Sequence, residues 1–273
     1  MSYFRNRQAV ITGAASGIGR ALAHELNQQG CALWLSDVNE AGLAETQASL
    51  PRSDVACDIR VVDVASREAM EAWADDISRH TDAVHIVINN AGVAHMGLAW
   101  DTDYADFHWL MNINFWGVVH GCRAFLPLLT SAPQSHLVNI SSVFGMIGVP
   151  TQSAYNAAKF AVKGYSEALR QELAQADSPI SLLCVHPGGI DTNIARNARN
   201  ADPSASADSQ HATFAPHVRT SAESAAQQIL RAAQKRRPRL LIGPDARVID
   251  WIVRLFPAAY TRLLGRRMDQ LAP

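Results

Sequence analysis

The sequence predicts an α/β fold in which a doubly wound, parallel, seven-stranded sheet carries helices on both faces. Short apolar runs alternate regularly with segments of helical periodicity, and the runs are continuously apolar instead of alternating with polar residues. Strands of that composition are typical of a parallel sheet that is covered on both sides. The length agrees with this prediction, because 273 residues suit one large domain of the α/β class.

Seven apolar runs are expected to form the strands, and they cover residues 9–12, 32–36, 59–64, 84–90, 136–142, 180–187 and 239–243. Helical patterns fill the intervals, at about 17–29, 40–50, 66–80, 109–129, 154–176 and 220–235. Ser66 is expected to cap the third of these helices. Thr220 and Glu223 form the T-x-x-E pattern of a capping box, which predicts that the last helix opens at Thr220.

The chain is expected to contain one domain, residues 1–245, followed by an amphipathic, basic, helical C-terminal extension, residues 246–273. Within the domain, residues 197–216 lack periodicity and are rich in Ser, Ala, Asp and Pro. A loop of that length in a compact domain is usually functional or disordered. We therefore expect residues 197–216 to form a loop that closes over a bound substrate.

The C-terminal extension combines an apolar stripe with positive charge. Between Arg231 and Arg267, ten Lys and Arg residues face only two acidic ones, a local net charge of +8 in a chain whose total is −1. The preferred interpretation is that the extension packs over a substrate cleft or against a second subunit. The alternative is an interfacial helix that lies on anionic lipid. The stripe has helical spacing and consists of Ile249, Ile252, Val253 and Phe256.

Composition excludes several classes of protein. With 48% hydrophobic and 18% charged residues, the chain resembles an ordinary globular protein, and no apolar run approaches the roughly 20 residues that span a bilayer. No signal peptide is recognised at the N-terminus. The four cysteines form no C-x-x-C pair, which favours reduced thiols and a cytoplasmic location. A location at the membrane periphery is the alternative. No His/Cys cluster has metal-ligand spacing, and neither a metal nor a nucleic-acid partner is expected.

The segment TGAASGIG (12–19) lies where the first strand meets the first helix. Its glycines allow a tight turn and a close approach to a ligand, and the following helix N-terminus attracts a pyrophosphate. Asp37 ends the second strand, where a carboxylate can accept hydrogen bonds from ribose hydroxyls and repel a 2′-phosphate. Asp37 can also serve as a turn or N-cap residue, and the two roles are compatible. No Lys or Arg follows at 38–40, so NAD is favoured over NADP.

Tyr155 and Lys159 are separated by one turn of a predicted helix, in the segment YNAAK. Residues at i and i+4 share a helix face. A neighbouring ammonium group stabilises a phenolate and lowers the pKa of the tyrosine, which can then act as an acid or a base on an alcohol or carbonyl oxygen. This spacing also occurs by accident, so the pair is weak evidence when taken alone.

The ordered motifs together resemble the short-chain dehydrogenase/reductase family in its form of about 250 residues. The resemblance is close over about residues 8–195, and it implies a Rossmann-like domain. It rests on the segments TGAASGIG (12–19), DV (63–64), NNAG (89–92), NINFWG (112–117), NISSVFG (139–145), YNAAK (155–159) and HPGGIDT (186–192).

The resemblance implies a role for each matching residue. Tyr155 is the acid/base, Lys159 assists it and binds the nicotinamide ribose, and Ser142, chosen over Ser141 by its spacing to Tyr155, binds the substrate oxygen. Asn114, chosen over Asn112, holds a water that relays protons. The implied cofactor-binding residues are Gly13, Ser16, Gly17, Ile18, Gly19, Asp37, Asp63, Val64, Asn90, Ala91, Gly92, Tyr155, Lys159, Pro187, Gly188, Ile190 and Thr192.

The expected reaction is the NAD(P)-dependent interconversion of a hydrophobic secondary alcohol and its ketone, such as a steroid-like, lipid-derived or aryl alcohol. The alternative is a regulatory or membrane-associated nucleotide-binding module with little turnover. A homodimer or homotetramer is expected. His186 is interpreted as a packed histidine, and His95 as either a cleft or a surface residue. The candidate substrate-lining residues are mostly apolar and comprise His95, Met96, Val143, Phe144, Met146 and Val149.

Overall fold

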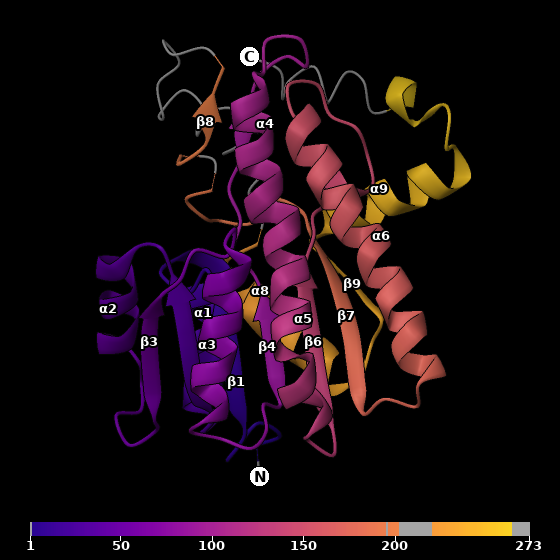
Figure 1. The fold of residues 1–273 in the computed structure, drawn as a ribbon. Helices are drawn as coiled ribbons and strands as arrows, with labels where there is room; N and C mark the ends of the chain where they lie inside the picture. Colours follow the sequence, from indigo (N-terminus) through magenta and orange to yellow (C-terminus); the bar gives the residue numbers. More distant parts are fainter. Residues whose placement is uncertain (1, 195, 202–219, 264–273) are drawn as a thin grey trace.

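A seven-stranded parallel sheet forms the centre of the molecule, in the strand order β3-β2-β1-β4-β6-β7-β9 (Figure 1). The structure is a computed structural model that describes residues 2–194, 196–201 and 220–263. The prediction of a doubly wound, seven-stranded sheet is confirmed. The strands are β1 (Gln8–Thr12), β2 (Ala32–Asp37), β3 (Cys57–Val61), β4 (Ile86–Asn89), β6 (Ser135–Ile140), β7 (Ile180–Pro187) and β9 (Arg239–Ile242).

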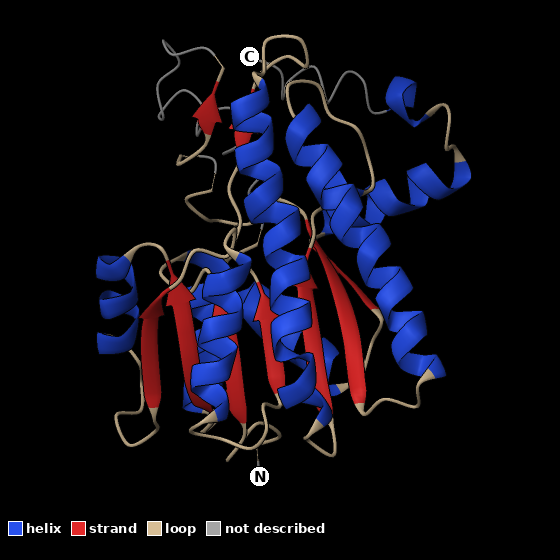
Figure 2. Ribbon diagram, in the orientation of Figure 1, coloured by secondary structure: helices blue, strands red, loops and turns tan. Residues whose placement is uncertain are grey.

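The strand order reverses between β1 and β4. From β1 the chain runs outward through β2 to β3, and then returns to pair β4 with the other side of β1. All strands point the same way, so their carboxyl ends meet at one edge of the sheet (Figure 2). In open α/β sheets, ligands bind outside the carboxyl ends of the strands at such a switch point.

Helices cover both faces of the sheet. Buried side chains from three helices, α1 (Gly17–Gln28), α2 (Glu40–Ala48) and α8 (Ala222–Gln234), pack on one face. The other face is covered by α3 (Arg67–Ser78), α5 (Gly117–Thr130) and α6 (Ser153–Gln175). The long helical stretch predicted at 109–129 is three segments, namely α4 (Tyr104–Met111), a π-helical turn η1 (Asn112–Trp116) and α5.

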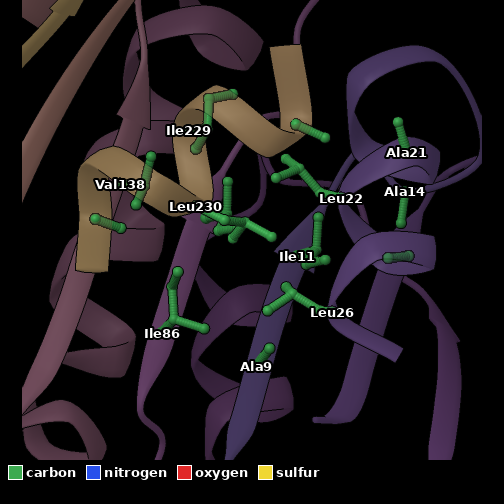
Figure 3. Packing of buried hydrophobic residues seen from close by; sticks show 14 of the residues in the cluster. Ala9, Ile11, Ala14, Ala21, Leu22, Leu26, Ile86, Val138, Ile229 and Leu230 are labelled. Atoms are coloured by element: carbon green, nitrogen blue, oxygen red, sulfur yellow. The ribbon is translucent and has the colours of Figure 1, made fainter. Parts of the chain in front are cut away.

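The core explains why the strands are continuously apolar. Along β1, Ala9 and Ile11 belong to the hydrophobic cluster under α1 and α8, whereas Val10 belongs to the cluster on the opposite face. Figure 3 shows Ile11 close to Leu22 of α1 and to Leu230 of α8. Successive side chains of a strand point to opposite faces. Because both faces are buried here, every position of β1 from Ala9 onward must avoid water.

Smaller elements lie beyond the carboxyl edge of the sheet. A two-stranded parallel ribbon joins β5 (His95–Met96) to β8 (Arg199–Asn200). A 3₁₀ turn, η2 (Val143–Gly145), follows β6. The C-terminal helix α9 (Pro244–Leu255) begins directly after β9 and lies on the side of the molecule away from α2 (Figure 1).

The two predicted helix caps differ in outcome. Ser66 does cap α3, because its hydroxyl accepts a hydrogen bond from the N–H of Ala69 at 3.1 Å. The capping box at Thr220 is wrong by one residue, since Ser221 caps α8 and accepts from the N–H of Ser224. Thr220 instead forms a bridge with Ile190, and its carbonyl accepts from the N–H of Asp191, so its backbone belongs to the segment that precedes the helix.

Candidate active site

A cavity of about 400 Å³ opens at the carboxyl edge of the sheet, at the switch point. Its wall begins at the β1–α1 turn and the end of β2, and continues across the ends of β4 and β6 to the first turn of α6 and the end of β7. Ligand pockets are commonly of this size. The segments that sequence analysis singled out separately therefore converge on one cavity.

The β1–α1 turn is built for close approach of a ligand. Gly13 and Gly17 have φ values of +67° and +52°, which residues with a Cβ rarely adopt. A Cβ on Gly19 would lie 2.0 Å from the carbonyl oxygen of Gly13, so only glycine allows α1 to start this close to the turn. Ser16 precedes α1 without a side-chain bond to it, and the cavity wall includes Ser16, Gly17 and Ile18. The free N–H groups of this helix N-terminus can hold a pyrophosphate.

The carboxylate of Asp37 closes the cavity at the end of β2. One oxygen accepts from the N–H of Ala15 at 3.1 Å and the other from the N–H of Asn39 at 3.0 Å. Asp37 thus stabilises the turn after β2 and also faces the cavity, and the sequence had indicated that these two roles are compatible. The N-cap of α2 is Asn39, whose side chain accepts from the N–H of Gly42.

Positive charge is scarce in this part of the cavity. Lys159 is the only Lys or Arg among the described residues that line it. Arg20 emerges from α1 nearby, but its guanidinium contacts Glu45 at 3.0 Å and the hydroxyl of Thr46 at 2.9 Å. No described cation is therefore placed to bind a phosphate next to Asp37.

The end of β4 is tied to the end of β1. The Asn90 side chain donates to the carbonyl oxygens of Thr12 and Gly13, both at 3.0 Å. In return, the Thr12 hydroxyl accepts from the N–H groups of Asn90 and Ala91 at 3.0 and 3.1 Å. These four bonds hold the turn that carries Gly13 against the NNAG segment, and they explain why small residues follow Asn90.

Tyr155 and Lys159 lie one turn apart at the start of α6, where both line the cavity. Lys159 is only 3% exposed; its Nζ donates to the carbonyl of Ile140 at 3.2 Å and lies 5.6 Å from the centre of the Tyr155 ring. Burial lowers the pKa of Lys159 to about 8, because a charged ammonium loses its hydration there.

Lys159 is expected to lower the pKa of Tyr155, and burial acts against such an effect in the protein alone. Burial raises the pKa of Tyr155 to about 12, and only the hydrogen bond with the Ser142 hydroxyl acts in the opposite direction. Desolvation of the phenolate is the largest influence on the pKa of Tyr155, and burial also disfavours the charge of the neighbouring Lys159. Tyr155 therefore holds its proton at neutral pH.

Two adjacent serines follow β6, and their hydroxyl groups have different partners. The Ser141 hydroxyl donates to the carbonyl of Lys159 at 2.9 Å, which anchors α6 to the strand end. The Ser142 hydroxyl accepts from the N–H of Phe144 at 3.1 Å and also bonds Tyr155. Both residues contribute atoms to the cavity wall, but only Ser142 directs its hydroxyl to Tyr155.

Asn114 occupies the π-helical turn η1 and is fully buried, whereas Asn112 is exposed. The side-chain nitrogen of Asn114 donates to the carbonyl of Val93, and the side-chain oxygen of Asn114 accepts from the N–H of Val93, both at 2.8 Å. Single π-helical turns frequently occur at functional sites. Here the turn fixes the chain after NNAG, since a Cβ on Gly92 would lie 3.1 Å from the Asn114 amide oxygen and 3.5 Å from Lys159 Nζ.

The comparisons with known proteins agree with this geometry. The family model of the short chain dehydrogenases matches residues 7–203. The putative oxidoreductase SadH of Mycobacterium tuberculosis is 44% identical over 278 residues, which cover 100% of this chain and 99% of the relative. The chain belongs to the short-chain dehydrogenase family. It is an oxidoreductase of that family, and its expected membership is confirmed.

Solved structures resemble this short-chain dehydrogenase over nearly its whole length. A short chain dehydrogenase/reductase from Burkholderia phymatum, solved in complex with NAD, has a TM-score of 0.84 and 30% identity, over 93% of this chain and 96% of that one. A short-chain dehydrogenase from Streptomyces avermitilis has a TM-score of 0.80 and 26% identity, over 95% of this chain and 97% of that one.

Most of the site residues predicted for this short-chain dehydrogenase meet in the cavity. Gly19 and Asn114 stand directly behind its wall, where they shape the glycine turn and the NNAG segment. The predicted residues that line the cavity are Gly13, Ser16, Gly17, Ile18, Asp37, Asp63, Val64, Asn90, Ala91, Gly92, Ser142, Tyr155, Lys159, Pro187, Gly188, Ile190 and Thr192.

The six candidate substrate-lining residues do not line this cavity. Val143 and Met146 pack with Ala246 of α9, and Val149 packs with Ile249 of the same helix. The sequence did not show that α9 would cover the segment after Ser142. Phe144 comes nearest to the site, because its ring meets Tyr155 edge-on at 6.1 Å.

The remaining two of these six lie on β5. Met96 and His95 are both buried, so His95 is not the surface residue that the sequence allowed, and it is not among the described residues that line this cavity. The Nε2 atom of His95 lies 3.6 Å from a carboxylate oxygen of Asp106. Burial lowers the pKa of His95, and Asp106 opposes this effect.

Residues 202–216 of the expected substrate loop lie outside the described residues. At its start, Asn197 lines the cavity, and Arg199 is anchored by Asp106 at 2.7 Å and by the face of Trp109 at 3.7 Å. Arg199 is therefore engaged, and it is a poor candidate for binding a substrate carboxylate.

His186 is packed, as expected. It is fully buried; its Nδ1 lies 3.1 Å from the carbonyl of Ser142, and burial lowers its pKa to about 4. The ring is therefore neutral, and Nδ1–H donates to Ser142.

Two supporting residues escaped sequence analysis. The carboxylate of Asp245 accepts from the N–H of Gly189 at 3.0 Å, beneath the Pro187–Gly188 wall of the cavity. Asn156 holds the segment after Ser142, because it donates to two of its carbonyls at 2.7 Å and accepts from the N–H of Val149 at 3.0 Å. A polar residue inside YNAAK was the only sequence signal, and nothing marked Asp245.

Among the described residues, no group of His, Cys, Asp or Glu side chains could hold a metal ion. No helix within the described ranges is both long enough and apolar enough to cross a membrane.

Proposed function

We propose that this short-chain dehydrogenase interconverts a hydrophobic secondary alcohol and its ketone with NAD, and that Tyr155 is the acid/base. The observation that carries the proposal is the meeting of Tyr155, Ser142 and Lys159 at one end of the cavity whose other end is Asp37. The strands β2 and β6, which carry these two ends, are three strand spacings apart, or about 14 Å. A dinucleotide can span that distance.

The bound nicotinamide supplies or accepts the hydride. In the reductive direction, the Tyr155 hydroxyl donates its proton to the carbonyl oxygen of the ketone. Its pKa of about 12 keeps that proton available at neutral pH. In the oxidative direction a deprotonated Tyr155 would accept the proton of the alcohol, and a charged ammonium on Lys159 would stabilise that phenolate.

Ser142 and Asn114 support this step in different ways. The hydroxyl of Ser142 bonds Tyr155 and is placed to donate to the same substrate oxygen, where negative charge develops. Asn114 holds the chain beside Lys159, and we retain the proposal that it places a proton-relaying water there. Both polar atoms of its side chain are engaged by Val93, so the water would bind to backbone groups of the π-helical turn.

NAD is proposed over NADP because Asp37 ends β2 and no described cation lines the cavity beside it. The Burkholderia phymatum structure was solved with NAD, which supports the same choice. A hydrophobic substrate is proposed because apolar side chains occupy much of the wall away from Asp37. These residues are Val93, Ile113, Ile140, Ile190 and Ile194.

A panel assay tests the proposal. The purified chain is mixed with NADH or NADPH and with cyclic, aryl and steroid-like ketones, and loss of absorbance of the reduced cofactor is followed. Turnover with NADH on an apolar ketone is expected. Tyr155→Phe should abolish turnover and keep NADH binding, measured by fluorescence titration. Binding without turnover on any member of the panel would instead favour the regulatory nucleotide-binding module, and retained activity in Tyr155→Phe would refute the mechanism.

Self-association into a homodimer or homotetramer is part of the proposal. Trp116 of η1 and Phe160 of α6 are aromatic side chains exposed to water on two elements that contact each other. An exposed aromatic pair of this kind favours a protein contact. Light scattering should show an oligomer whose mass is a multiple of the 29.6 kDa mass of the chain. The double variant Trp116→Ser with Phe160→Ser should reduce the measured oligomeric mass. A monomeric wild type would contradict this part.

We also retain the cytoplasmic location as a proposal. All four cysteines are free, in keeping with a reducing compartment. Cell fractionation followed by blotting tests this location.

A further inference from the structure

The helix α9 is apolar on two faces, and only one of them is covered. The stripe recognised in the sequence contributes Ile249, Ile252 and Val253, which pack against Ile147 and Val149 of the segment after Ser142. This part of the extension therefore packs within its own chain, and the inner face of α9 needs no further partner.

The outer face of α9 is a second apolar stripe. Val248, Trp251 and Leu255 are 51%, 67% and 62% exposed, and their spacing of three and four residues places them on one side of the helix. Beyond the helix, Phe256 and Leu263 are also exposed. Scattered exposed apolar residues are ordinary, but a row that includes a tryptophan on one helix face usually marks a binding surface.

The charge beside this outer face is positive. Arg247 and Arg254 are exposed on α9, next to the stripe, and Arg262 is exposed shortly after it. The two carboxylates of α9 are already bonded, because Asp245 accepts from the N–H of Gly189 and Asp250 binds Arg239 at 2.6 Å and Arg254 at 3.1 Å. Arg254 is thus paired within the helix, whereas Arg247 has no ion pair with the described carboxylates of α9. A surface that complements this face must therefore be apolar where it meets the stripe and acidic where it meets the arginines.

The helix is held rigidly in place. Asp245 fixes its first turn to Gly189, Asp250 fixes its middle to Arg239, and the Tyr260 hydroxyl beyond its end accepts from the N–H of Gly148 at 3.0 Å. The outer face is consequently presented in a fixed orientation at the side of the molecule (Figure 1). It loses little conformational freedom when it binds.

We propose that the outer face of α9, formed by Val248, Trp251 and Leu255 with Arg247 and Arg254, binds an anionic lipid surface. Helices with Trp and Leu on one face and arginines beside it lie in the interface of a bilayer, where the apolar side chains enter the lipid and the arginines meet the headgroups. Tryptophan is enriched at that depth because its ring is amphipathic.

A second copy of the chain fits this face less well. In a two-fold contact both copies present the same patch, so each copy must itself supply the acidic partner for the arginines of the other. Among the described residues of α9, Asp245 is bonded to Gly189 and Asp250 is shared by Arg239 and Arg254, so no carboxylate of α9 is left for Arg247. Like charges brought together at an interface are destabilising, whereas anionic headgroups supply the missing negative charge.

Docking through α9 would also place the cavity next to the membrane. The first turn of α9 contacts Gly189, which directly follows the cavity wall at Pro187–Gly188. An apolar substrate dissolved in the bilayer would then have a short path to Tyr155. This consequence rests on the proposed function, whereas the docking itself does not.

Vesicle flotation tests the proposal without any substrate or turnover. The full-length protein is mixed with vesicles of phosphatidylcholine alone, or of phosphatidylcholine with phosphatidylglycerol, at low and at high salt. We expect binding to the anionic vesicles at low salt only. Arg247→Ala should weaken the partition coefficient about fivefold. Trp251→Glu combined with Leu255→Glu should weaken it by at least about tenfold.

Matched controls come from other surfaces of the same chain. Trp100→Glu and Arg170→Ala alter equally exposed residues away from α9 and should leave flotation unchanged. NADH binding and thermal melting of each variant show that the fold is intact. The proposal is overturned if wild type does not float with anionic vesicles at low salt, or if it floats equally with neutral ones. It is also overturned if wild type stays unbound while Trp251→Glu lowers the oligomeric mass, since the face is then a contact between copies.

Discussion

The two halves of the cavity are built from different parts of the chain. The half near β1 and β2 consists largely of backbone, with Gly13 and Gly17 at positive φ and the N-terminus of α1 open to the cavity. The half near β6 and α6 consists of side chains, with Ser142 bonded to Tyr155 and Lys159 Nζ 5.6 Å from the centre of the Tyr155 ring. The first half offers shape and backbone N–H groups to a ligand, whereas the second presents ionisable groups whose pKa values are shifted by burial.

This difference shows what each half tolerates. In the backbone half, one added methyl group is enough to close the turn, while the side chain of Ser16 makes no bond to the helix that it precedes. In the half near β6 and α6, we expect the loss of one hydroxyl to alter the proposed chemistry and to leave the fold intact. Mutations should therefore separate binding from turnover, and the largest single effect is expected in the backbone half.

Gly19→Ala should abolish binding of the cofactor. The new Cβ would lie 2.0 Å from the carbonyl oxygen of Gly13, so the turn or α1 must move. Gly164→Ala is the matched control, because a Cβ there meets nothing within 4 Å. NADH titration by fluorescence should show no saturable binding for Gly19→Ala and unchanged affinity for Gly164→Ala. Normal affinity in Gly19→Ala would show that the backbone half is not shaped as tightly as described.

Ser142→Ala should lower kcat by about 10²–10³ and leave cofactor affinity almost unchanged, because one preorganised donor is lost. Ser141→Ala is its counterpart. It removes the hydrogen bond to the carbonyl of Lys159 and should lower the free energy of unfolding by about 1 kcal/mol, with a smaller effect on kcat. Steady-state kinetics and urea unfolding measure the two effects. Equal losses of kcat in both variants would contradict the assignment of Ser142.

Asp37→Ala and Asp37→Asn should each weaken NAD binding by about tenfold. They should also narrow the preference of the protein for NAD over NADP. The two variants differ in one respect, since Asn keeps one amide oxygen, which can accept from the N–H of Ala15 or from that of Asn39 but not from both. If Asp37 acts through its charge, both variants should narrow the preference equally. If it acts by supporting the turn, Asp37→Asn should narrow the preference less than Asp37→Ala. Dissociation constants for both cofactors decide between the two, and a wild type that prefers NADP would refute the role of Asp37.

Acid should destabilise the protein through His186, whose folded pKa of about 4 lies below its usual value of 6.5. The unfolded chain binds a proton between these values that the folded chain does not. Stability is therefore lost as the pH falls from about 6.5 to about 4. His186→Gln should make this decline shallower, and the exposed His108→Gln should leave it unchanged. Urea midpoints across this range test the prediction, and an unchanged slope in His186→Gln would contradict it.

Sequence patterns were most informative where backbone geometry decides function. Gly13, Gly17 and Asp37 were recognised from their places at strand ends, and the structure brings all three to one cavity. The seven strands could be predicted equally well, because a sheet buried on both faces requires continuous apolar runs. The ends of the strands were predicted less accurately. The third strand ends at Val61 instead of residue 64, and Asp63 and Val64 beyond it line the cavity.

The interactions between distant segments could not be predicted in the same way. Asp245 lies 56 residues from Gly189 in the chain, and only the pairing of β7 with β9 brings α9 beneath that loop. The six substrate-lining candidates were chosen from their nearness to Ser142 and NNAG in sequence. Val143, Met146 and Val149 instead lie under α9, because an apolar helix that follows the last strand packs on the nearest apolar segment.

The sequence by itself determined the family, the parallel sheet, the glycine turn and the pairing of Tyr155 with Lys159, since each depends on local spacing or on periodicity. Tertiary structure alone decided the pKa values of that pair. Burial raises the pKa of Tyr155 and lowers that of Lys159, and burial depends on every segment packed around α6. It also decided which stripe of α9 is covered, because Ile249 meets Val149 while Trp251 remains exposed to water. Spacing along a chain specifies neighbours on one element, but desolvation is a property of the assembled fold.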